Sequence, residues 1–467
     1  MTIKAKEKFL YASGAVANGV KNDAFTFFLL FFYSNVIGLT PGLASLAIFI
    51  ALIVDAFTDP IMGVISDRTN HRLGRRHPYF LLGIIPMGLS YFMLFSIQLS
   101  WGLSQQYLFL WMLTFTILTR LGMTIFDVPH RSLGSEMSRS YTERTSIFAA
   151  REMFGWAGGL FNAFLAYTVF FKDTPEYIPG TQNPEPWIYY GMTGATLMSI
   201  SVLVTYFGTL KYRHTSFNDQ ISFDLKLILS QILTVLQNKS FLLFFFGYLF
   251  IAVSWGLNSS LQIYMNTYFW EFKSIMIASF LGIYALSTFS AFLLVPRLVS
   301  FLEKRSILLF AITLAALIPP IPILLYLNDI LPDSGSWNLF FALAPFIYIA
   351  NTCLSSSAII RESMLGDISD EVELESKIGQ QGLMYASSSL IGKLNTGLGI
   401  LVAGLALEFI GFPQGSEILP DADQIFSLAM VQGPFVAVLM IVPFGIFSFY
   451  KIDRERHRNI LSQLEVR

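Results

Sequence analysis

Residues 43–65 read LASLAIFIALIVDAFTDPIMGVI, an apolar run that is interrupted by two aspartates. About 20 apolar residues are enough to cross the hydrocarbon core of a bilayer as a helix. Asp55 and Asp59 stand four residues apart, which puts both carboxylates on one helix face, one turn apart. Ionisable groups at this depth are costly and usually face a cavity or a partner. The run therefore predicts a membrane helix with a polar function.

The whole chain has the composition that this run suggests. Its 467 residues are 54% hydrophobic and 13% charged, and they include 45 Phe. Soluble domains carry about 25% charged residues, and the mean hydropathy here is +0.58. The composition predicts an all-α integral membrane protein that crosses the bilayer many times. The net charge of -1 excludes a nucleic-acid binder that relies on bulk basicity.

Cysteine and histidine usage excludes further classes. A single cysteine, Cys353, rules out an intramolecular disulfide and any cysteine-built metal cluster. The five histidines are interpreted as lying in polar connecting segments or the tail, so no histidine metal site or proton relay is expected within the membrane. These positions are His71, His77, His130, His214 and His457.

The length criterion predicts twelve spanning helices, six in each half. They are expected at about 12–37, 43–65, 79–99, 106–129, 146–171, 188–210, 240–268, 275–297, 306–327, 337–360, 381–411 and 426–450. The domains that follow are a six-helix bundle over 1–210, a cytoplasmic central loop over 211–239, a second bundle over 240–450 and a tail over 451–467.

Basic residues orient these helices. Of the 30 Lys and Arg, 24 fall in the segments that are cytoplasmic if the chain starts inside, and two, Lys172 and Lys273, fall in outer loops. Cytoplasmic loops carry the excess of Lys and Arg. Both termini are therefore expected inside the cell. Short outer loops favour the inner (plasma) membrane of a bacterium.

The two halves echo each other. Arg131-Ser-Leu-Gly-Ser-Glu136 follows one predicted helix, and Arg361-Glu-Ser-Met-Leu-Gly-Asp367 follows its counterpart in the second half. Two parallel six-helix repeats around an axis along the membrane normal are typical of the major facilitator fold, which carries its substrate near the bilayer midplane.

The acidic pair favours a cation site. Two carboxylates one turn apart repel each other unless a cation or a proton lies between them. Asp55 and Asp59, with Thr58 beside them, offer hard oxygen ligands for Na⁺, Li⁺ or H⁺. The alternative is a structural pair bound to buried arginines. Thr124 and Asp127 follow on another predicted helix, where Asp127 either completes the site, accepts a substrate hydroxyl or forms an internal ion pair.

Further polar residues interrupt the apolar helices. Arg120 and Asp127 are two turns apart and need not touch. Arg151 and Glu152 either line the interior or form an interfacial pair that reaches back to water. A lone lysine, Lys393, requires an acid or a ligand. In the first helix, polar groups suited to sugar hydroxyls, carboxylates or sulfates are Asn18, Lys21 and Asn22.

These motifs resemble a known family. Gly63-Val-Ile-Ser-Asp67-Arg68, followed by Gly74-Arg75-Arg76, resembles the loop signature of the major facilitator superfamily. Asp55-Ala-Phe-Thr-Asp59-Pro-Ile-Met-Gly63 is similar to a helix motif of the glycoside–pentoside–hexuronide:cation symporters, the family of the melibiose carrier.

The resemblance implies roles for individual residues. The cation site would consist of Asp55, Thr58, Asp59 and Thr124, with Asp127 bridging cation and sugar, while Arg151 and Lys393 would line the sugar site. Two departures matter. Asn18 and Gly19 stand where melibiose carriers hold the sugar with a Lys-Asp pair, and Arg131 stands where they have a tryptophan. The surplus of basic groups favours an acidic glycoside such as a hexuronide.

The expected function is secondary transport by alternating access, with Na⁺ or H⁺ as the only cofactor and a monomer in the bilayer as the working unit. A gate on the cytoplasmic side would involve Asp67, Arg68, Arg75, Arg76, Arg131, Glu136 and Asp367. Animal lysolipid symporters share the acidic motif, so a cation-dependent transporter of amphiphiles is the first alternative. A membrane-embedded enzyme is the second, but no cysteine nucleophile, metal-ligand cluster or soluble catalytic domain is expected. We therefore predict a carrier without enzymatic activity.

Overall fold

All regular elements of the described chain are helices. The computed structural model describes the backbone of residues 3–138, 141–213, 238–376, 381–415 and 418–465. The side chains of residues 141–142, 145, 375–376, 381–395 and 465 lie outside the described set. No strand occurs within these described ranges, which agrees with the predicted all-α class.

The chain divides into two compact units. Unit 1 comprises Met1–Ile221, Lys273–Ala278 and Ala403–Pro420, and unit 2 comprises Ser222–Phe272, Ser279–Val402 and Asp421–Arg467. The domain limits expected at residues 210, 239 and 450 stay a prediction, and most of the central connection lies outside the described residues.

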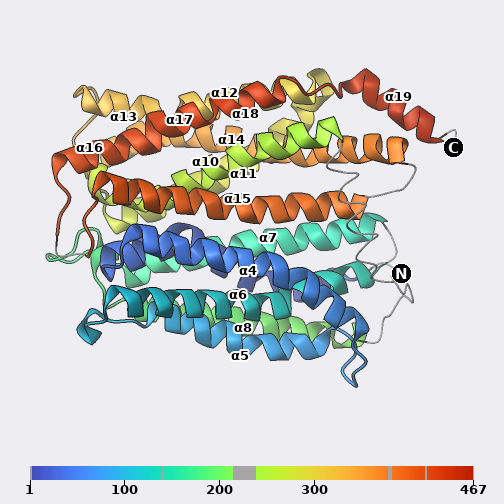
Figure 1. Cartoon of the computed structure of the whole chain (residues 1–467), viewed down its shortest axis with the longest axis horizontal. Helices are drawn as coiled ribbons and strands as arrows, with labels where there is room; N and C mark the ends of the chain where they lie inside the picture. Colours follow the sequence, from blue (N-terminus) through green and yellow to red (C-terminus); the bar gives the residue numbers. More distant parts are fainter. Residues whose placement is uncertain (1–2, 139–140, 214–237, 377–380, 416–417, 466–467) are drawn as a thin grey trace. The chain divides into compact units, whose positions relative to one another are not determined.

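Unit 1 contains the first half of the helices (Figure 1). They are α1 (Ala5–Ala12), α2 (Ala15–Asp23), η1 (Ala24–Phe28), α3 (Leu29–Phe31), η2 (Phe32–Val36), α4 (Pro41–Arg68), α5 (His77–Phe95), η3 (Leu99–Trp101), α6 (Gln105–Glu136), α7 (Tyr141–Leu165), η4 (Ala166–Phe170), η5 (Gly180–Gln182), α8 (Trp187–Thr209) and η6 (Leu210–Tyr212).

The second half of the chain gives a similar series, of which α11 and α15 contribute segments to both units. The elements are α10 (Lys239–Tyr264), η7 (Met265–Phe269), α11 (Ser274–Phe301), α12 (Lys304–Leu317), α13 (Pro320–Leu327), α14 (Trp337–Ser376), α15 (Gln381–Ile410), α16 (Ala422–Met430), η8 (Val431–Phe435), α17 (Val436–Leu439), α18 (Ile441–Phe447) and α19 (Arg454–Glu465).

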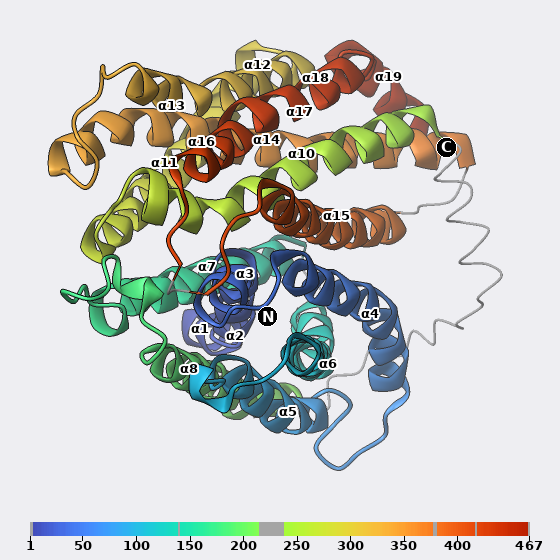
Figure 2. The ribbon, with the colours of Figure 1, turned by 60° about the vertical axis from the view of Figure 1, so that its left-hand side comes forward.

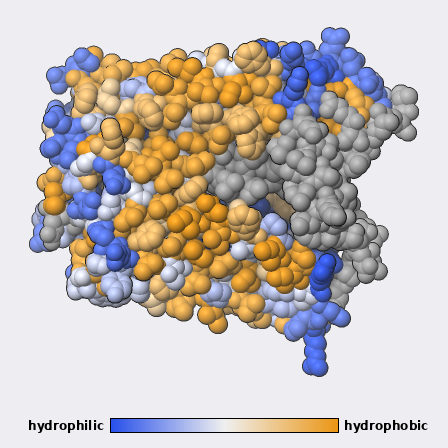
Figure 3. Space-filling model, viewed as in Figure 1, coloured by the Kyte–Doolittle hydropathy of each residue, from blue (hydrophilic) through white to orange (hydrophobic). Residues whose placement is uncertain are grey.

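Ten helices of the described residues are long and apolar enough to cross a membrane. They lie at ten of the twelve predicted positions. The other two positions are residues 15–36, which alternate between short α-helical and π-helical runs, and α15, of which only Thr396–Ile410 counts as a shorter apolar helix. Apolar side chains cover the middle of the helices and polar ones gather at the helix ends (Figure 3).

Two helices are longer than the hydropathy pattern predicts. α6 continues to Glu136 instead of ending near residue 129, and α14 continues to Ser376 instead of ending near residue 360. Hydropathy marks where the apolar run stops, but a helix ends only where its backbone bonding is interrupted. The predicted loops after these two spans are therefore helical, and their charges sit at fixed intervals on a helix.

Small residues bring the helices of unit 1 into close contact. A Cβ atom on Gly19 of α2 would overlap the carbonyl oxygen of Gly155 on α7, and one on Gly122 of α6 would lie 2.5 Å from the backbone nitrogen of Met87 on α5. Lipid tails are as apolar as leucine, so membrane helices associate through close packing and hydrogen bonds. These contacts fix the positions of the polar side chains described below.

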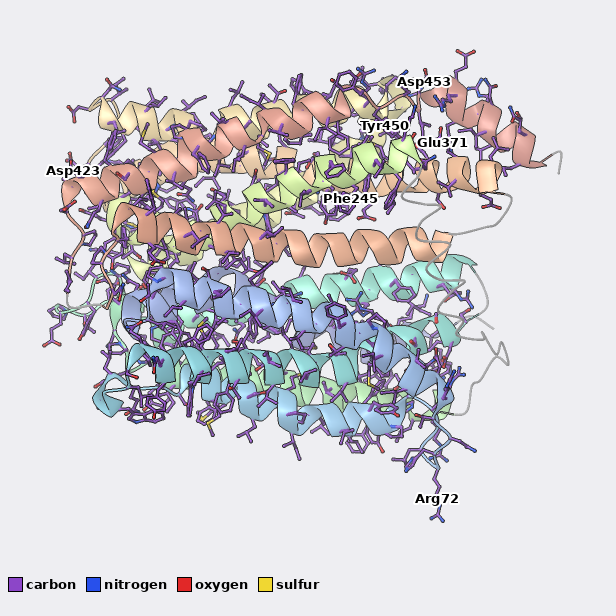
Figure 4. The ribbon with its side chains drawn as sticks, in the orientation of Figure 1. Arg72, Phe245, Glu371, Asp423, Tyr450 and Asp453 are labelled. Carbon is purple, nitrogen blue, oxygen red and sulfur yellow. The ribbon has the colours of Figure 1, made fainter. Side chains whose placement is uncertain are left out.

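Unit 2 has an apolar core that ends in ion pairs. Phe244 and Phe447 are fully buried in this core, together with Tyr450. Tyr450, Glu371 and Asp453 lie at one end of the unit, and Asp423 lies at the other (Figure 4). At the end with Tyr450, Arg456 pairs with Glu371 at 2.5 Å.

Candidate functional site

The acidic pair of α4 meets a hydroxyl from α6. Asp55 is buried, and its Oδ1 lies 3.0 Å from the Thr124 hydroxyl, while Oδ1 of Asp59 lies 2.7 Å from the same hydroxyl. A hydroxyl has one proton, so it donates to only one of the two carboxylates at a time. Its oxygen also keeps lone pairs. The structure therefore brings five hard oxygen atoms from three side chains together.

Arg120 offsets part of the negative charge at this cluster. Its Nη1 lies 3.3 Å from Oδ2 of Asp55, and its guanidinium lies 5.1 Å from the ring centroid of Phe25. With both carboxylates ionised, Asp55, Asp59 and Arg120 sum to one negative charge. A single monovalent cation would bring that sum to zero.

The Thr58 hydroxyl forms a hydrogen bond within its own helix, α4. Its hydroxyl donates to the backbone carbonyl of Asp55 at 3.3 Å, three residues earlier on the same helix. Within the described residues it makes no recorded hydrogen bond to either carboxylate. Its proposed role as a cation ligand stays a prediction, and Thr124 is the hydroxyl that reaches both acids.

Asp127 belongs to a separate network of ion pairs. It accepts from Arg151 at 2.5 Å and from Arg131 at 2.8 Å, and Arg151 also donates to Glu152 at 2.6 Å. Arg151 is 2% exposed, whereas the Glu152 side chain is 65% exposed. Arg151 is therefore a buried residue, as one of the two sequence interpretations expects. Glu152 is the solvent-accessible member of this series of ion pairs. Arg120 and Asp127 have different partners, as their spacing predicts.

The remaining predicted substrate residues divide into two groups. In α2, Lys21 is buried, Asn18 is partly buried and Asn22 is exposed. Lys21 makes contacts of its own, so it is not a free cation. The backbone of Lys393 belongs to α15, but its side chain lies outside the described residues.

Four of the predicted gate residues form an ion-pair cluster on unit 1, namely Asp67, Arg75, Arg76 and Glu136. Arg76 donates to Asp67 at 2.5 Å and to Glu136 at 2.6 Å, while Arg75 reaches the same oxygen of Glu136 at 2.8 Å. The cluster ties the end of α4 to the end of α6. Arg72, in the loop between α4 and α5, points away from the bundle (Figure 4).

The other gate candidates behave differently. Arg68 is exposed, and Arg131 pairs with Asp127 instead of joining the gate cluster. Asp367 of unit 2 pairs with Lys304 at 2.7 Å. Three of the seven predicted gate residues therefore lie outside the ion-pair cluster, and the gating role of the seven stays a prediction.

A family profile described as "MFS/sugar transport protein" matches residues 10–454. The chain belongs to this family. The match covers nearly all of the sequence, and the resemblance to cation symporters of glycosides is confirmed. The protein is a multi-pass membrane transporter of the cation-coupled symporter type, not an enzyme.

Relatives cover almost the whole chain. An uncharacterized symporter, YnaJ of Bacillus subtilis, is 28% identical over 100% of this chain and 96% of its own. The isoprimeverose transporter of Lactiplantibacillus pentosus is 22% identical over 96% of this chain and 89% of its own. A sodium-dependent lysophosphatidylcholine symporter of Danio rerio is 25% identical over 98% of this chain and 88% of its own.

Solved structures agree on the fold. The crystal structure of the nucleoside transporter NupG is similar with a TM-score of 0.63 and 14% identity, over 96% of this chain and 100% of that one. At this identity the likeness supports the major facilitator fold alone.

The structure overturns one sequence-based expectation for this symporter. His130 does not lie in a connecting loop but is fully buried within α6, where it stacks on Tyr11 with ring centroids 4.4 Å apart. His77 is also fully buried and lies 3.0 Å from the Thr209 hydroxyl. The prediction for His130 failed because α6 continues through Pro129. A proline is tolerated inside a membrane helix because neighbouring groups satisfy the backbone carbonyl that it leaves without a hydrogen bond.

Proposed function

We propose that this symporter couples the uptake of a glycoside to Na⁺ or H⁺ at Asp55, Asp59 and Thr124. One observation supports this assignment most directly, namely the Thr124 hydroxyl within hydrogen-bond distance of both carboxylates. Arg120 forms an ion pair with Asp55, and its single positive charge offsets one of the two carboxylate charges.

The proposed substrate region adjoins this site along α6. Asp127 is one helical turn from Thr124, and its two arginine partners hold its carboxylate in place. A sugar hydroxyl would bond to Asp127 or Arg151, and Lys21, Asn18, Asn22 and Lys393 remain proposed contacts. Cation binding would order the carboxylates and raise affinity for the sugar. By linkage, the sugar must raise cation affinity equally.

A hexuronide is one proposed form of the glycoside. The sequence shows a surplus of basic groups, but Arg120, Arg131 and Arg151 all pair with aspartates in the structure. This pairing weakens the case for an acidic substrate and keeps neutral glycosides within the proposal. We further propose an inner-membrane monomer with both termini cytoplasmic, no cofactor besides the ion, and rocking-type alternating access.

The test is uptake by reconstituted vesicles. Neutral glycosides, hexuronides and lysophosphatidylcholine would each be offered under an imposed Na⁺ or H⁺ gradient. Wild type would be compared with Asp59→Asn and with Asp423→Asn, a matched change at an exposed aspartate. The proposal expects cation-driven uptake of a glycoside that Asp59→Asn abolishes and Asp423→Asn keeps.

Other outcomes would redirect the assignment. Uptake of lysophosphatidylcholine with no glycoside signal would support an amphiphile carrier like the zebrafish relative. Cation-driven glycoside uptake that survives in Asp59→Asn would refute the cation site while leaving the substrate class intact.

A further inference from the structure

Arg120 and Thr124 contact different oxygens of the Asp55 carboxylate. α4 and α6 lie side by side in unit 1 (Figure 2), so side chains of α6 reach the acids of α4. The Nη1 atom of Arg120 lies 3.3 Å from Oδ2 of Asp55, whereas the Thr124 hydroxyl lies 3.0 Å from Oδ1. The fixed positive charge of Arg120 therefore acts on a carboxylate that also belongs to the proposed coupling site.

The Arg120 guanidinium is held in place without saturating this carboxylate. Its side chain is 7% exposed, and its guanidinium lies 5.1 Å from the ring centroid of Phe25, close enough for the ring face to attract the cation. At 3.3 Å its pair with Asp55 is longer than the usual charge-assisted hydrogen bond of about 2.7–2.9 Å. A carboxylate has about four lone-pair sites. Arg120 on Oδ2 therefore does not prevent an ion from contacting Oδ1.

The ligand atoms of the proposed coupling site do not by themselves exclude divalent ions. Asp55, Asp59 and Thr124 offer two carboxylates and a hydroxyl, and the hydroxyl lies within hydrogen-bond distance of both acids. Carboxylate oxygens are also the usual ligands of Mg²⁺ and Ca²⁺. A symporter whose coupling ion is Na⁺ or H⁺ therefore needs a further feature that rejects divalent cations.

The charge of Arg120 can make this distinction. The Coulomb energy of two charges is proportional to their product. The guanidinium therefore repels a divalent ion at Asp55 twice as strongly as a monovalent ion at the same place. Asp55 and Asp59 make further contacts, and the repulsion from Arg120 adds to whatever those contacts contribute.

We propose that Arg120 makes the coupling site selective for monovalent over divalent cations. This inference rests on the proposed function, because it requires the ion to bind at Asp55, Asp59 and Thr124. It goes further by assigning ion selectivity to a side chain that is not itself a ligand. Arg120 is thus a specificity-determining residue, whose charge lowers the affinity for every cation and most strongly for divalent ones.

The test measures the binding of radioactive Na⁺ and Ca²⁺ to the purified full chain. Arg120→Gln removes the charge and keeps a side chain that can donate to Asp55. For an ion about 6 Å from the guanidinium, Na⁺ affinity should rise about 10- to 100-fold. Ca²⁺ affinity should rise by the square of that factor, about 100- to 10,000-fold.

Thermal unfolding gives a second readout that also works for a less stable variant. A ligand that binds only the folded state raises the melting temperature. Ca²⁺ should therefore stabilise Arg120→Gln against unfolding and should leave the melting temperature of wild type unchanged.

Two further variants serve as controls. Arg120→Lys keeps the positive charge and should still exclude Ca²⁺. Arg361→Gln removes another buried arginine, whose guanidinium lies 4.9 Å from the ring centroid of Tyr248 and forms no recorded ion pair within the described residues. It belongs to unit 2 and should leave the affinity for both ions unchanged.

The outcomes separate this inference from the proposed function. If Arg120→Gln binds Ca²⁺ no better than wild type, or gains equally for Na⁺ and Ca²⁺, Arg120 does not select by charge. Loss of cation-driven uptake in Asp59→Asn would then still support the coupling site. Ca²⁺ binding gained in Arg120→Gln should disappear when Asp59→Asn is added. Its persistence in that double variant would place the ion elsewhere and overturn the inference.

Discussion

Replacing Thr124 by valine tests the proposed coupling site at its centre. Valine has nearly the same shape as threonine but lacks the oxygen that lies 3.0 Å from Asp55 and 2.7 Å from Asp59. Both carboxylates and Arg120 remain in place. The change therefore removes one neutral ligand and leaves the charge of the site unaltered.

The expected loss of cation affinity follows from the interactions that the Thr124 hydroxyl makes with and without the bound cation. Its single proton bonds to one carboxylate with or without the cation, so that contribution largely cancels. Its lone pairs contact the cation only in the occupied site. An interaction between a neutral group and a charged one contributes about 1.5–3 kcal/mol. Apparent cation affinity should therefore fall about 10- to 150-fold.

The assay is the cation dependence of uptake in reconstituted vesicles, using the glycoside found by the substrate panel. Thr124→Val should need about 10- to 150-fold more cation for half-maximal uptake, with the maximal rate nearly unchanged. Thr124→Ser keeps the oxygen and should resemble wild type.

A second valine serves as the control. Thr116 lies on the same helix and is fully buried, and its hydroxyl has no hydrogen-bond partner in the described part of the chain. Thr116→Val should leave cation dependence unchanged. An unchanged cation requirement in Thr124→Val, or a tighter one, would refute the assignment of this hydroxyl as a ligand.

Two further predictions concern helix packing and the ion-pair cluster of Asp67, Arg75, Arg76 and Glu136. Gly122→Ala should cost about 1–3 kcal/mol of stability, because its Cβ would press on the backbone of α5, whereas Gly282→Ala, with nothing within 4 Å, should melt like wild type in a thermal unfolding assay. Arg76→Gln should cost about 1.5–3 kcal/mol and slow transport, because Glu136 on α6 loses one of its two arginine partners and keeps Arg75. Arg72→Gln, at an exposed position, should change neither melting nor uptake; equal effects of both arginine variants would contradict the proposed gate.

Much of the architecture follows from the sequence because the bilayer imposes a simple rule. Each crossing needs a long apolar run with its backbone bonded internally, and only helices provide this in a chain of such runs. Asp55 and Asp59 could therefore be identified from the sequence, because charged residues are rare within an apolar run. Their shared helix face followed from the spacing alone.

Helix ends were less accessible to prediction. The apolar run ends near residue 129, but α6 continues to Glu136 because its backbone bonding continues. This extension buried His130 and placed Arg131 one turn from Asp127. Hydropathy reports the surroundings of a segment and does not report where its helix stops.

The sequence by itself determined the helical class, the positions of the spans and the acidic pair of α4. Only the tertiary structure decided which side chains meet across helices. Thr124 joins that pair, and Arg120 forms an ion pair with one of its two acids. The physical reason is that periodicity fixes a residue's face on its own helix, whereas helix rotation and spacing are set by close contacts such as Gly19 against Gly155.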